Sequence, residues 1–201
     1  MSRLLEDGLE ALGFAMSNKQ IAQLNGMMDS LEIWGKKHNL TSLKTRDDFI
    51  VYHILDSLSG AKYFNRYNCV LDIGTGAGFP GIPLAILFPE KTFHLLDANT
   101  KKIAYLRNLI YQLKLDNVQL HHCRVQDFNN DLVEVITSRA LADPYEIARM
   151  TKHMVQKSAL ILYVSKRDKL LQGFESHEVH VPFSSKQHYV LLVRDRKSLS
   201  N

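Results

Sequence analysis

The chain is poor in cysteine, proline and tryptophan, with two, five and one of them among its 201 residues. The two cysteines, Cys69 and Cys123, are too few for the disulfide framework of a small secreted domain. Charged residues interrupt the first apolar ones, so we expect no secretory signal peptide. The sequence also lacks any apolar run approaching the roughly 20 residues of a membrane-spanning helix. We therefore expect a cytoplasmic protein with no membrane partner.

The composition is that of an ordinary globular protein. Hydrophobic residues make up 45% of the chain and charged residues 23%, which excludes a disordered or fibrous protein. The length predicts one large domain, or one domain with an extension. A chain of this size buries roughly 70% of the surface that its unfolded state exposes, so its core needs no disulfide to hold it.

The charge of the chain is unevenly distributed. The net charge at pH 7 is +4, and the positive excess comes from residues 61–201, because residues 1–60 carry more Asp and Glu than Lys and Arg. A basic body suits a polyanionic partner through contacts with phosphate groups. A basic enzyme that never binds a nucleic acid would give the same balance, so charge alone does not decide between them.

Residues 1–60 carry helical signals. Ser17 and Gln20 form the spacing of a capping box, and helical periodicity then predicts a helix to about His38. A break is expected over 39–42, followed by a second cap at Thr45 with Asp48. We interpret residues 1–60 as a helical extension packed on a body of residues 61–201. The apolar positions on which these helices depend are Ile21, Leu24, Met28, Leu31, Trp34, Phe49, Ile50, Ile54, Leu55 and Leu58.

From Cys69 onward, short apolar segments alternate with helical ones. This alternation predicts βαβ units and a mostly parallel sheet covered on both faces. The last two strands have no helix between them, which predicts an antiparallel pair at one edge. The expected strands are residues 69–73, 93–97, 118–121, 133–136, 159–164, 178–181 and 189–193.

The stretch from Leu71 to Gly81 is the most informative part of the sequence. Glycines after a buried strand let the backbone turn sharply and approach a ligand closely, at the carboxyl end of the sheet. Gly76, Gly78 and Gly81 match a dinucleotide fingerprint, but a dinucleotide loop would begin at Gly74 and require glycine where Phe79 stands. The match to a nicotinamide-binding loop is therefore poor.

Two acids favour S-adenosylmethionine (SAM) as the ligand of this loop. Asp72 lies inside the last turn of the strand, and Asp97 ends the next strand, where it is well placed for the hydroxyls of a ribose. An acid, three alternating glycines and a second acid after the next strand form the usual pattern of SAM enzymes. The expected cofactor contacts of the loop are Gly74, Gly76, Gly78 and Phe79, with Asp97 beside them.

Several further motifs accompany the glycine loop along the chain. They are Trp34, Asn39–Thr41, His53–Ser57, Asp72–Ala85, Leu95–Asp97, Arg124–Val125 and Ser138–Ala140. In these motifs the sequence closely resembles the RsmG (GidB) family of bacterial 16S rRNA guanine-N7 methyltransferases. The resemblance implies a Rossmann-like seven-stranded SAM-dependent methyltransferase fold for residues 61–201 behind the helical extension. It also implies that the methyl group goes to N7 of the position-527 guanine in the decoding-region loop.

The resemblance also assigns further site residues. Val125 and Gln126 should flank the adenine of the cofactor, and Arg139 should lie at the mouth of the site. Gln126 departs from the acid that the family often has there, although an amide can still form hydrogen bonds. Lys166-Arg167 replaces a Lys-Gly pair common in the family.

The chemistry of guanine N7 explains why no general base is evident. N7 carries a lone pair and no proton, so the enzyme mainly has to orient the reacting atoms. His53, Asp56 and Arg139 are the candidates near the target base. Because the purine becomes cationic, we expect Arg139 to bind a phosphate or the SAM carboxylate rather than to contact N7. His53 and Asp56 share a helix face at i, i+3, either lining the site or docking the extension on the sheet.

Other residue clusters give weaker hypotheses. His121-His122-Cys123 and the histidines at 177, 180 and 188 lack the paired spacing of a zinc site, so we expect no metal. Asp143-Pro144-Tyr145 is interpreted as a helix start, and both cysteines as packing residues. Lys101-Lys102 and Lys166-Arg167 with Lys169 form either solvated faces or an RNA-tracking surface.

Several functions stay open at this level. The leading hypothesis is a monomeric rRNA methyltransferase whose partner is 16S rRNA or the small ribosomal subunit. The alternatives are a SAM enzyme acting on another RNA base or a small molecule, a nicotinamide-binding Rossmann protein, and an assembly factor that holds SAM without turnover.

Overall fold

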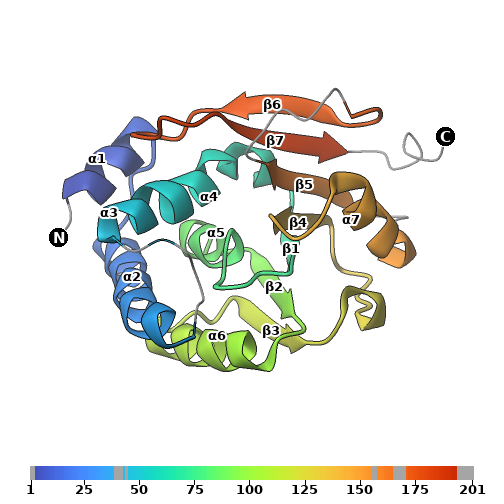
Figure 1. The fold of residues 1–201 in the computed structure, drawn as a ribbon, viewed down its shortest axis with the longest axis horizontal. Coiled ribbons are helices and arrows are strands. Elements are labelled where there is room, and N and C mark those ends of the chain that lie inside the picture. The colour runs from blue at the N-terminus through green and yellow to red at the C-terminus, as the bar shows by residue number, and fades with distance from the viewer. Residues whose placement is uncertain (1–2, 39–42, 44, 155–157, 165–170, 194–201) are drawn as a thin grey trace.

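The computed structural model describes residues 3–38, 43, 45–154, 158–164 and 171–193. Its centre is a seven-stranded sheet with the order β3-β2-β1-β4-β5-β7-β6 (Figure 1). Strands β1 to β5 are parallel, and β7 pairs antiparallel with β5 and β6, as the sequence predicts. The strands are β1 (Cys69–Ile73), β2 (Thr92–Asp97), β3 (Val118–His122), β4 (Val135–Arg139), β5 (Ala159–Val164), β6 (Glu175–Val179) and β7 (His188–Val193).

Two strands differ from their predicted bounds by more than one residue. β4 starts at Val135 rather than at residue 133, because the Val133 N–H closes a turn by donating to the Asn130 carbonyl. β6 ends at Val179, since Val181 already belongs to the next turn, where its carbonyl accepts from the Ser184 N–H. In both cases a turn hydrogen bond removes an apolar residue from the strand that its hydropathy suggests.

Helices precede the sheet and connect its parallel strands. None of the described helices is both long enough and apolar enough to cross a membrane. The α-helices are α1 (Arg3–Ala11), α2 (Asn18–His38), α3 (Arg46–Phe49), α4 (Asp56–Ser59), α5 (Gly81–Leu87), α6 (Thr100–Leu113) and α7 (Pro144–Met150). The π-helical turn η1 (Ile50–Leu55) and the 3-10 turns η2 (Ala61–Phe64), η3 (Val125–Asp127) and η4 (Lys152–Met154) complete them.

Both predicted caps are present. The Gln20 N–H donates to Ser17 Oγ, and the Ser17 N–H donates back to Gln20 Oε1, which completes the capping box at the start of α2. At α3, the Asp48 N–H donates to Thr45 Oγ1. The predicted break over 39–42, including Asn39–Thr41, lies outside the described residues, as do Lys166, Arg167 and Lys169.

The helical stretch from Arg46 to Ser59 is continuous but widens in its middle. α3, η1 and α4 follow one another, and η1 is π-helical over six residues. π-Turns inside helices occur frequently at functional sites. This one carries His53 and ends immediately before Asp56, so both candidate residues stand at the widened part of the helix.

The sheet has one apolar cluster on each face, because successive strand residues point to opposite sides. Val70, Leu95 and Ile161 face a core that includes residues of α1, α2, α4, α5 and α6. Leu71, Leu96 and Leu160 face a core that includes residues of α7 and η3. Figure 1 shows α2 beside α6, in agreement with the shared core. The division at residue 60 into extension and body stays a prediction.

Candidate functional site

The candidate site lies where the loops after β1 and β4 meet at the carboxyl ends of the parallel strands. β1 and β4 are neighbours in the sheet, yet β1 connects onward to β2 on one side and β4 to β5 on the other. This is the switch point at which open α/β sheets form their ligand-binding crevice. The glycine loop after β1 and the residues after Arg139 form its two walls.

The glycine loop needs glycine for both space and backbone conformation. Gly74 has a φ of +62°, and a Cβ built there would lie 2.5 Å from Leu141 Cδ1 of the loop after β4. Gly76 has a φ of +63°, but a Cβ there would meet nothing closer than 3.8 Å. Gly76 therefore needs glycine for its backbone conformation, since a Cβ there would be only in ordinary van der Waals contact with Gly74 and Lys102.

Asp97 is joined to this loop. One of its carboxylate oxygens, Oδ2, accepts from the Gly76 N–H at 3.0 Å, and Oδ1 accepts from the Asn99 N–H at 2.8 Å. Lys102 Nζ approaches Oδ2 at 3.8 Å. A carboxylate oxygen can accept more than one hydrogen bond, so Asp97 keeps acceptor capacity for the hydroxyls of a ribose. Asp97, which the sequence places beside the loop, is thus in direct contact with it.

Asp72 is a buried residue that stabilises the loop through hydrogen bonds. It is fully buried, and its Oδ2 accepts from Thr75 Oγ1 at 2.6 Å and from the Gly81 N–H at 2.9 Å. Burial raises the pKa of this carboxyl group to about 7, against the opposing effect of these two hydrogen bonds. Asp72 therefore fixes both ends of the glycine turn.

Val125 and Gln126 differ in burial. Both belong to η3, after β3, where the Val125 side chain is buried in the core and Gln126 is exposed. Among the described residues, no hydrogen bond connects Gln126 with the loop. Their expected contact with an adenine stays a prediction.

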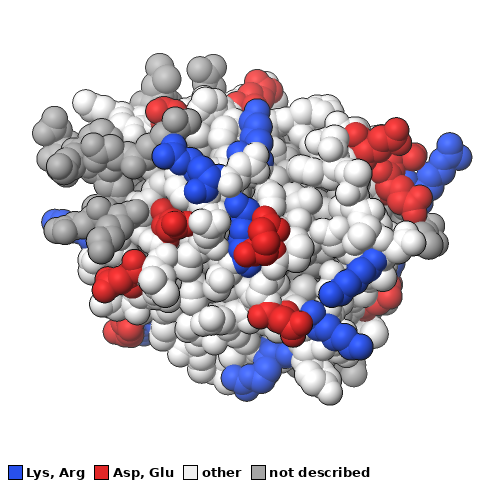
Figure 2. Space-filling view, turned by 180° about the vertical axis from the view of Figure 1, so that it is seen from behind, with Lys and Arg blue, Asp and Glu red and all other residues white. Residues whose placement is uncertain are grey.

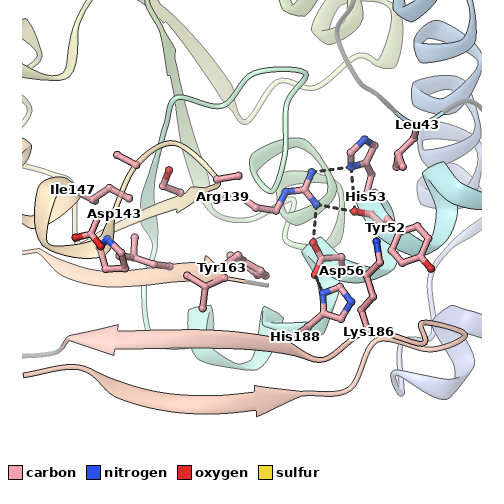
Figure 3. A pocket seen from close by; sticks show the side chains of 16 residues that line it. Leu43, Tyr52, His53, Asp56, Arg139, Asp143, Ile147, Tyr163, Lys186 and His188 are labelled. Carbon is pink, nitrogen blue, oxygen red and sulfur yellow. Dashed lines mark hydrogen bonds and ion pairs between the residues drawn. The ribbon is translucent and has the colours of Figure 1, made fainter. Parts of the chain in front are cut away.

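A pocket of about 590 Å³ opens on the other side of the loop, around Arg139. Its walls come from η1, from the end of β4 and the start of α7, from the end of β5 and from the turn between β6 and β7. Figure 3 shows His53, Asp56 and Tyr52 grouped around the guanidinium, with His188 and Lys186 on the lower side. Asp143, which caps α7 as predicted by accepting from the Tyr145 N–H, lines the far wall.

Arg139 ties the helical stretch before β1 to the sheet. Its Nη1 donates to Asp56 Oδ2 at 2.7 Å and to the Tyr52 carbonyl at 3.0 Å (Figure 3). Its Nη2 lies 2.9 Å from His53 Nδ1. These contacts use three of the five guanidinium N–H groups. His53 and Asp56 thus share Arg139 as a common partner, which fits docking of the helical stretch as well as lining of the site.

The Arg139 contact determines which nitrogen of His53 carries its proton. His53 Nδ1 lies 3.1 Å from the Tyr52 carbonyl and 2.9 Å from Arg139 Nη2. Nδ1 cannot serve both partners, because the guanidinium requires it to accept and the carbonyl requires it to donate. The shorter contact, with Arg139, favours an accepting Nδ1 and the neutral Nε2–H form. Burial, followed by the positive charge of Arg139, lowers the pKa of His53 to about 3. His53 is consequently uncharged at neutral pH.

Phe79 links the glycine loop with the Arg139 cluster. Its ring stacks on His53 with a centroid separation of 4.4 Å, and the Arg139 guanidinium carbon lies 5.1 Å from its centroid. Cation–π contacts of this kind are favourable at such distances. Phe79 is 4% exposed. The residue that departs from the dinucleotide fingerprint is therefore buried, in contact with the Arg139 cluster.

Sequence reasoning missed part of this cluster. Asp56 Oδ1 lies 2.8 Å from His188 Nδ1, and His188 Nε2 lies 2.9 Å from Ser184 Oγ. Tyr163, at the end of β5, donates from its hydroxyl to the Ser57 carbonyl at 2.7 Å. Sequence alternation places Tyr163 on the same sheet face as Arg139, which was a usable signal. Nothing in the sequence pairs His188 with Asp56.

Residues considered for other chemistry have different surroundings. His121 lies 2.9 Å from His94 on the neighbouring strand, and within the described ranges no three His, Cys, Asp or Glu side chains form a metal-binding group. Cys69 begins β1, at the opposite end of that strand from the site. Figure 2 shows Lys and Arg mixed with Asp and Glu on the face it displays, so charge does not mark a nucleic-acid surface there.

Solved structures share the fold. A SAM dependent methyltransferase from Aquifex aeolicus is 19% identical with a TM-score of 0.53, covering 69% of this chain and 89% of that one. M. capricolum TrmK, solved with S-adenosyl-homocysteine, is 16% identical with a TM-score of 0.53, covering 68% and 66%. These likenesses confirm the predicted Rossmann-like seven-stranded methyltransferase fold.

Curated relatives match at higher identity. A protein of Neisseria gonorrhoeae (strain NCCP11945), named ribosomal RNA small subunit methyltransferase G, is 39% identical over 152 residues, which cover 76% of this chain and 73% of that protein. A protein of the same name from Francisella philomiragia is 32% identical and covers 98% of both chains. The model of the family described as rRNA small subunit methyltransferase G (GidB) matches residues 20–199. The chain therefore belongs to the GidB family, as its sequence motifs indicate.

Proposed function

We propose that this chain is a SAM-dependent methyltransferase that modifies N7 of a guanine, at position 527, in the RNA of the small ribosomal subunit. The observation that carries the proposal is the contact of Phe79, a residue of the glycine loop, with His53 and Arg139, because both of these partners line the pocket. A methyl transfer requires such adjacency of a cofactor loop and a substrate pocket. Family membership supports the choice of RNA as the substrate.

The residues of the glycine loop fit SAM. The buried carboxylate of Asp97, held beside the loop by the Gly76 N–H, offers hydrogen-bond acceptors to a ribose. When bound, SAM supplies a methyl group activated by a sulfonium. The described contacts of Arg139 leave two of its N–H groups, one on Nε and one on Nη2. These two groups can donate to a carboxylate or a phosphate.

The Arg139 cluster has to orient the base without opposing its charge. Guanine N7 needs no general base, and neither His53 nor Asp56 is arranged as one, since both are engaged by Arg139. An isolated guanidinium beside the pocket would disfavour positive charge on the purine. The Asp56 carboxylate offsets that charge at 2.7 Å, while His53 is neutral. We infer that the cluster is a rigid wall of low net charge.

A second candidate is a SAM enzyme with another nucleophile, either another RNA base or a small molecule. The volume of the pocket, about 590 Å³, lies within the range of small-molecule sites. The mixed charges of the face in Figure 2 are also compatible with it. Only the identity of the methylated product separates the two candidates.

The test supplies labelled SAM to small subunits from a bacterium that lacks this modification, and then digests the RNA to nucleosides. Label in 7-methylguanosine at one site is the expected result. Label in another nucleoside would overturn the base assignment, and absence of label with SAM bound would favour a small-molecule substrate or an assembly role. Absence of SAM binding in calorimetry would refute the cofactor assignment.

A matched pair of variants tests the cofactor site. Asp97→Ala removes the proposed ribose acceptor and should weaken SAM binding about tenfold or more, the usual effect of losing a hydrogen bond to a charged group. Asp116→Ala, an exposed acid before the amino end of β3, is the control and should bind SAM as the unmodified chain does. Equal affinities would show that Asp97 does not hold the cofactor.

A further inference from the structure

The turn between β6 and β7 displays an aromatic side chain that the fold does not use. Phe183 is 55% exposed, and among the described residues no ring contact involves it. It follows Pro182 in a turn closed by the Ser184 N–H, which donates to the Val181 carbonyl at 3.1 Å. A single exposed apolar side chain is common on protein surfaces, so the exposure of Phe183 gains meaning only from its backbone and its neighbours.

The backbone of Phe183 is also unusual. Its φ is +64°, in the left-handed region, at the turn position where glycine is strongly preferred. A bulky residue with positive φ is a genuine outlier, and here no burial of the ring compensates for the strain. The strained backbone and the exposed ring are therefore both explained if Phe183 contacts a ligand instead of packing in the core.

A lysine lies on the same turn, at the rim of the pocket. Lys186 is exposed, and its Nζ lies 4.7 Å from the centroid of the Tyr52 ring. Both residues line the Arg139 pocket, and Figure 3 shows the lysine extended alongside that ring. No carboxylate among the described residues forms an ion pair with Lys186. Its positive charge is consequently open to an anion beside the pocket.

The turn is held firmly in place. Val181 and Pro182 are buried, and Ser184 Oγ accepts from the Lys186 N–H at 3.1 Å. The same hydroxyl lies 2.9 Å from His188, which in turn contacts Asp56. The turn is thus connected to the Arg139 cluster through a chain of short polar contacts. A surface anchored in this way can present Phe183 and Lys186 at a fixed distance from the target base.

We propose that the turn 181–186 binds the single-stranded nucleotides beside the target base, with Phe183 stacking on a neighbouring base and Lys186 contacting a phosphate. This inference rests on the proposed function and deepens it by assigning the RNA contacts outside the pocket. Aromatic rings next to a cation are the usual means by which proteins hold unpaired nucleotides. A peptide partner would not require a cation at the rim of a nucleobase pocket.

Two substitutions of Phe183 test the stacking. Phe183→Leu keeps an apolar side chain but removes the π-face, and it should weaken binding of protein-free 16S rRNA about tenfold by fluorescence titration, the scale of one lost base–aromatic stack. Phe183→Trp should retain binding. Tyr111→Leu is the control, because Tyr111 is 84% exposed on α6, outside the pocket. SAM affinity should be unchanged in all three variants, which also reports correct folding.

Lys186→Gln tests the phosphate contact through its salt dependence. The slope of the logarithm of RNA affinity against the logarithm of salt concentration should fall by about one. Lys62→Gln is a matched control, since Lys62 Nζ lies 5.1 Å from the centroid of Tyr63 but on another surface. Its slope should equal that of the unmodified chain.

The outcomes separate this inference from the proposed function. If the unmodified chain methylates small subunits but Phe183→Leu and Lys186→Gln bind protein-free rRNA normally, the RNA surface is refuted while the function stands. If the variants lose affinity only for the intact subunit, the turn contacts a ribosomal protein and the inference is again overturned. Loss of affinity for protein-free rRNA in both variants supports it, whichever base is methylated.

Discussion

Arg139 donates from Nη1 to Asp56 Oδ2 at 2.7 Å, across 83 residues of sequence. The two side chains are only 16% and 11% exposed, so little water screens their charges. Asp56 belongs to α4 and Arg139 ends β4, which makes this ion pair a connection between the helical stretch before β1 and the centre of the sheet. Burial raises the pKa of Asp56, but the hydrogen bonds and charges of His188 and Arg139 prevail and lower it overall.

Removing one partner of this ion pair should destabilise the fold strongly. Asp56→Leu or Arg139→Met leaves an uncompensated buried charge, which usually costs about 3–5 kcal/mol in the free energy of unfolding. The double variant R139M/D56L should lose less than the sum of the two single variants. Urea unfolding monitored by circular dichroism measures all three.

The exposed pair Glu146 and Arg149 on α7 provides the control. Its side chains are 49% and 77% exposed and lie 3.7 Å apart, so Glu146→Ala should change stability by about 1 kcal/mol or less. Strictly additive losses in R139M/D56L would show that Arg139 and Asp56 do not stabilise one another.

His53 should remain neutral over the whole neutral and mildly acidic range. Its pKa is lowered to about 3 by burial and by the charge of Arg139. Nitrogen-detected NMR of the imidazole should therefore show the Nε2–H form at pH 7 and no titration above about pH 5. In Arg139→Met the pKa should rise, because one of its two lowering causes is removed. A protonated Nδ1 at pH 7 would contradict the hydrogen bond from Arg139.

Local features of this fold could be predicted from the sequence, whereas most contacts of the site could not. The caps at Ser17 and Thr45 depend on residues three positions away, and the order of strands and helices follows from hydropathy. β4 and β6 were misplaced because turn hydrogen bonds, invisible in hydropathy, remove Val133 and Val181 from the ladder. These errors are of two or three residues and leave the topology intact.

Only part of the site could be predicted from the sequence. Gly76 and Asp97 were each expected to contact the cofactor, and the structure brings them into contact because a fixed βαβ geometry relates the ends of adjacent strands. The contact of Asp56 with His188 joins residues from opposite ends of the chain, and no local pattern encodes it. The aromatic contacts of Phe79 likewise depend on how the π-helical turn is placed over the sheet.

The stability of the chain should depend on pH through Asp72. Its pKa rises from 3.8 to about 7 on folding, so between these values the folded state holds a proton that the unfolded state has released. The contribution of Asp72 to the free energy of unfolding is fully present below about pH 4. It falls by roughly 4 kcal/mol as the pH rises toward 7. Asp72→Asn abolishes this dependence while it preserves the shape of the side chain.

The measurement compares the two proteins across pH. The difference in unfolding free energy between Asp72→Asn and the unmodified chain should be constant below about pH 4 and then shift in favour of the variant up to pH 7. An amide can still accept from Thr75 and Gly81 through its oxygen, so the glycine turn should persist. A difference that does not vary between pH 4 and 7 would place the pKa of Asp72 near its ordinary value.

Gly74 and Leu141 should behave as a coupled pair across the two loops of the site. In Gly74→Ala the new methyl group meets Leu141 Cδ1 at 2.5 Å, and the φ of +62° adds about 1 kcal/mol of backbone strain. SAM binding should weaken about tenfold, because the backbone strain at residue 74 and the displaced Leu141 side chain both disturb the cofactor loop. Leu141→Ala alone should have little effect, since Leu141 is already 38% exposed.

The double variant G74A/L141A separates the clash from the strain. Removing the Leu141 side chain eliminates the steric contact but leaves the left-handed backbone, so SAM affinity should recover in part and not completely. Gly13→Ala is a control for strain alone, because Gly13 has a φ of +78° and a Cβ there meets nothing within 4 Å. If G74A/L141A bound SAM no better than Gly74→Ala, the loss would come entirely from the backbone conformation and not from contact between the loops after β1 and β4.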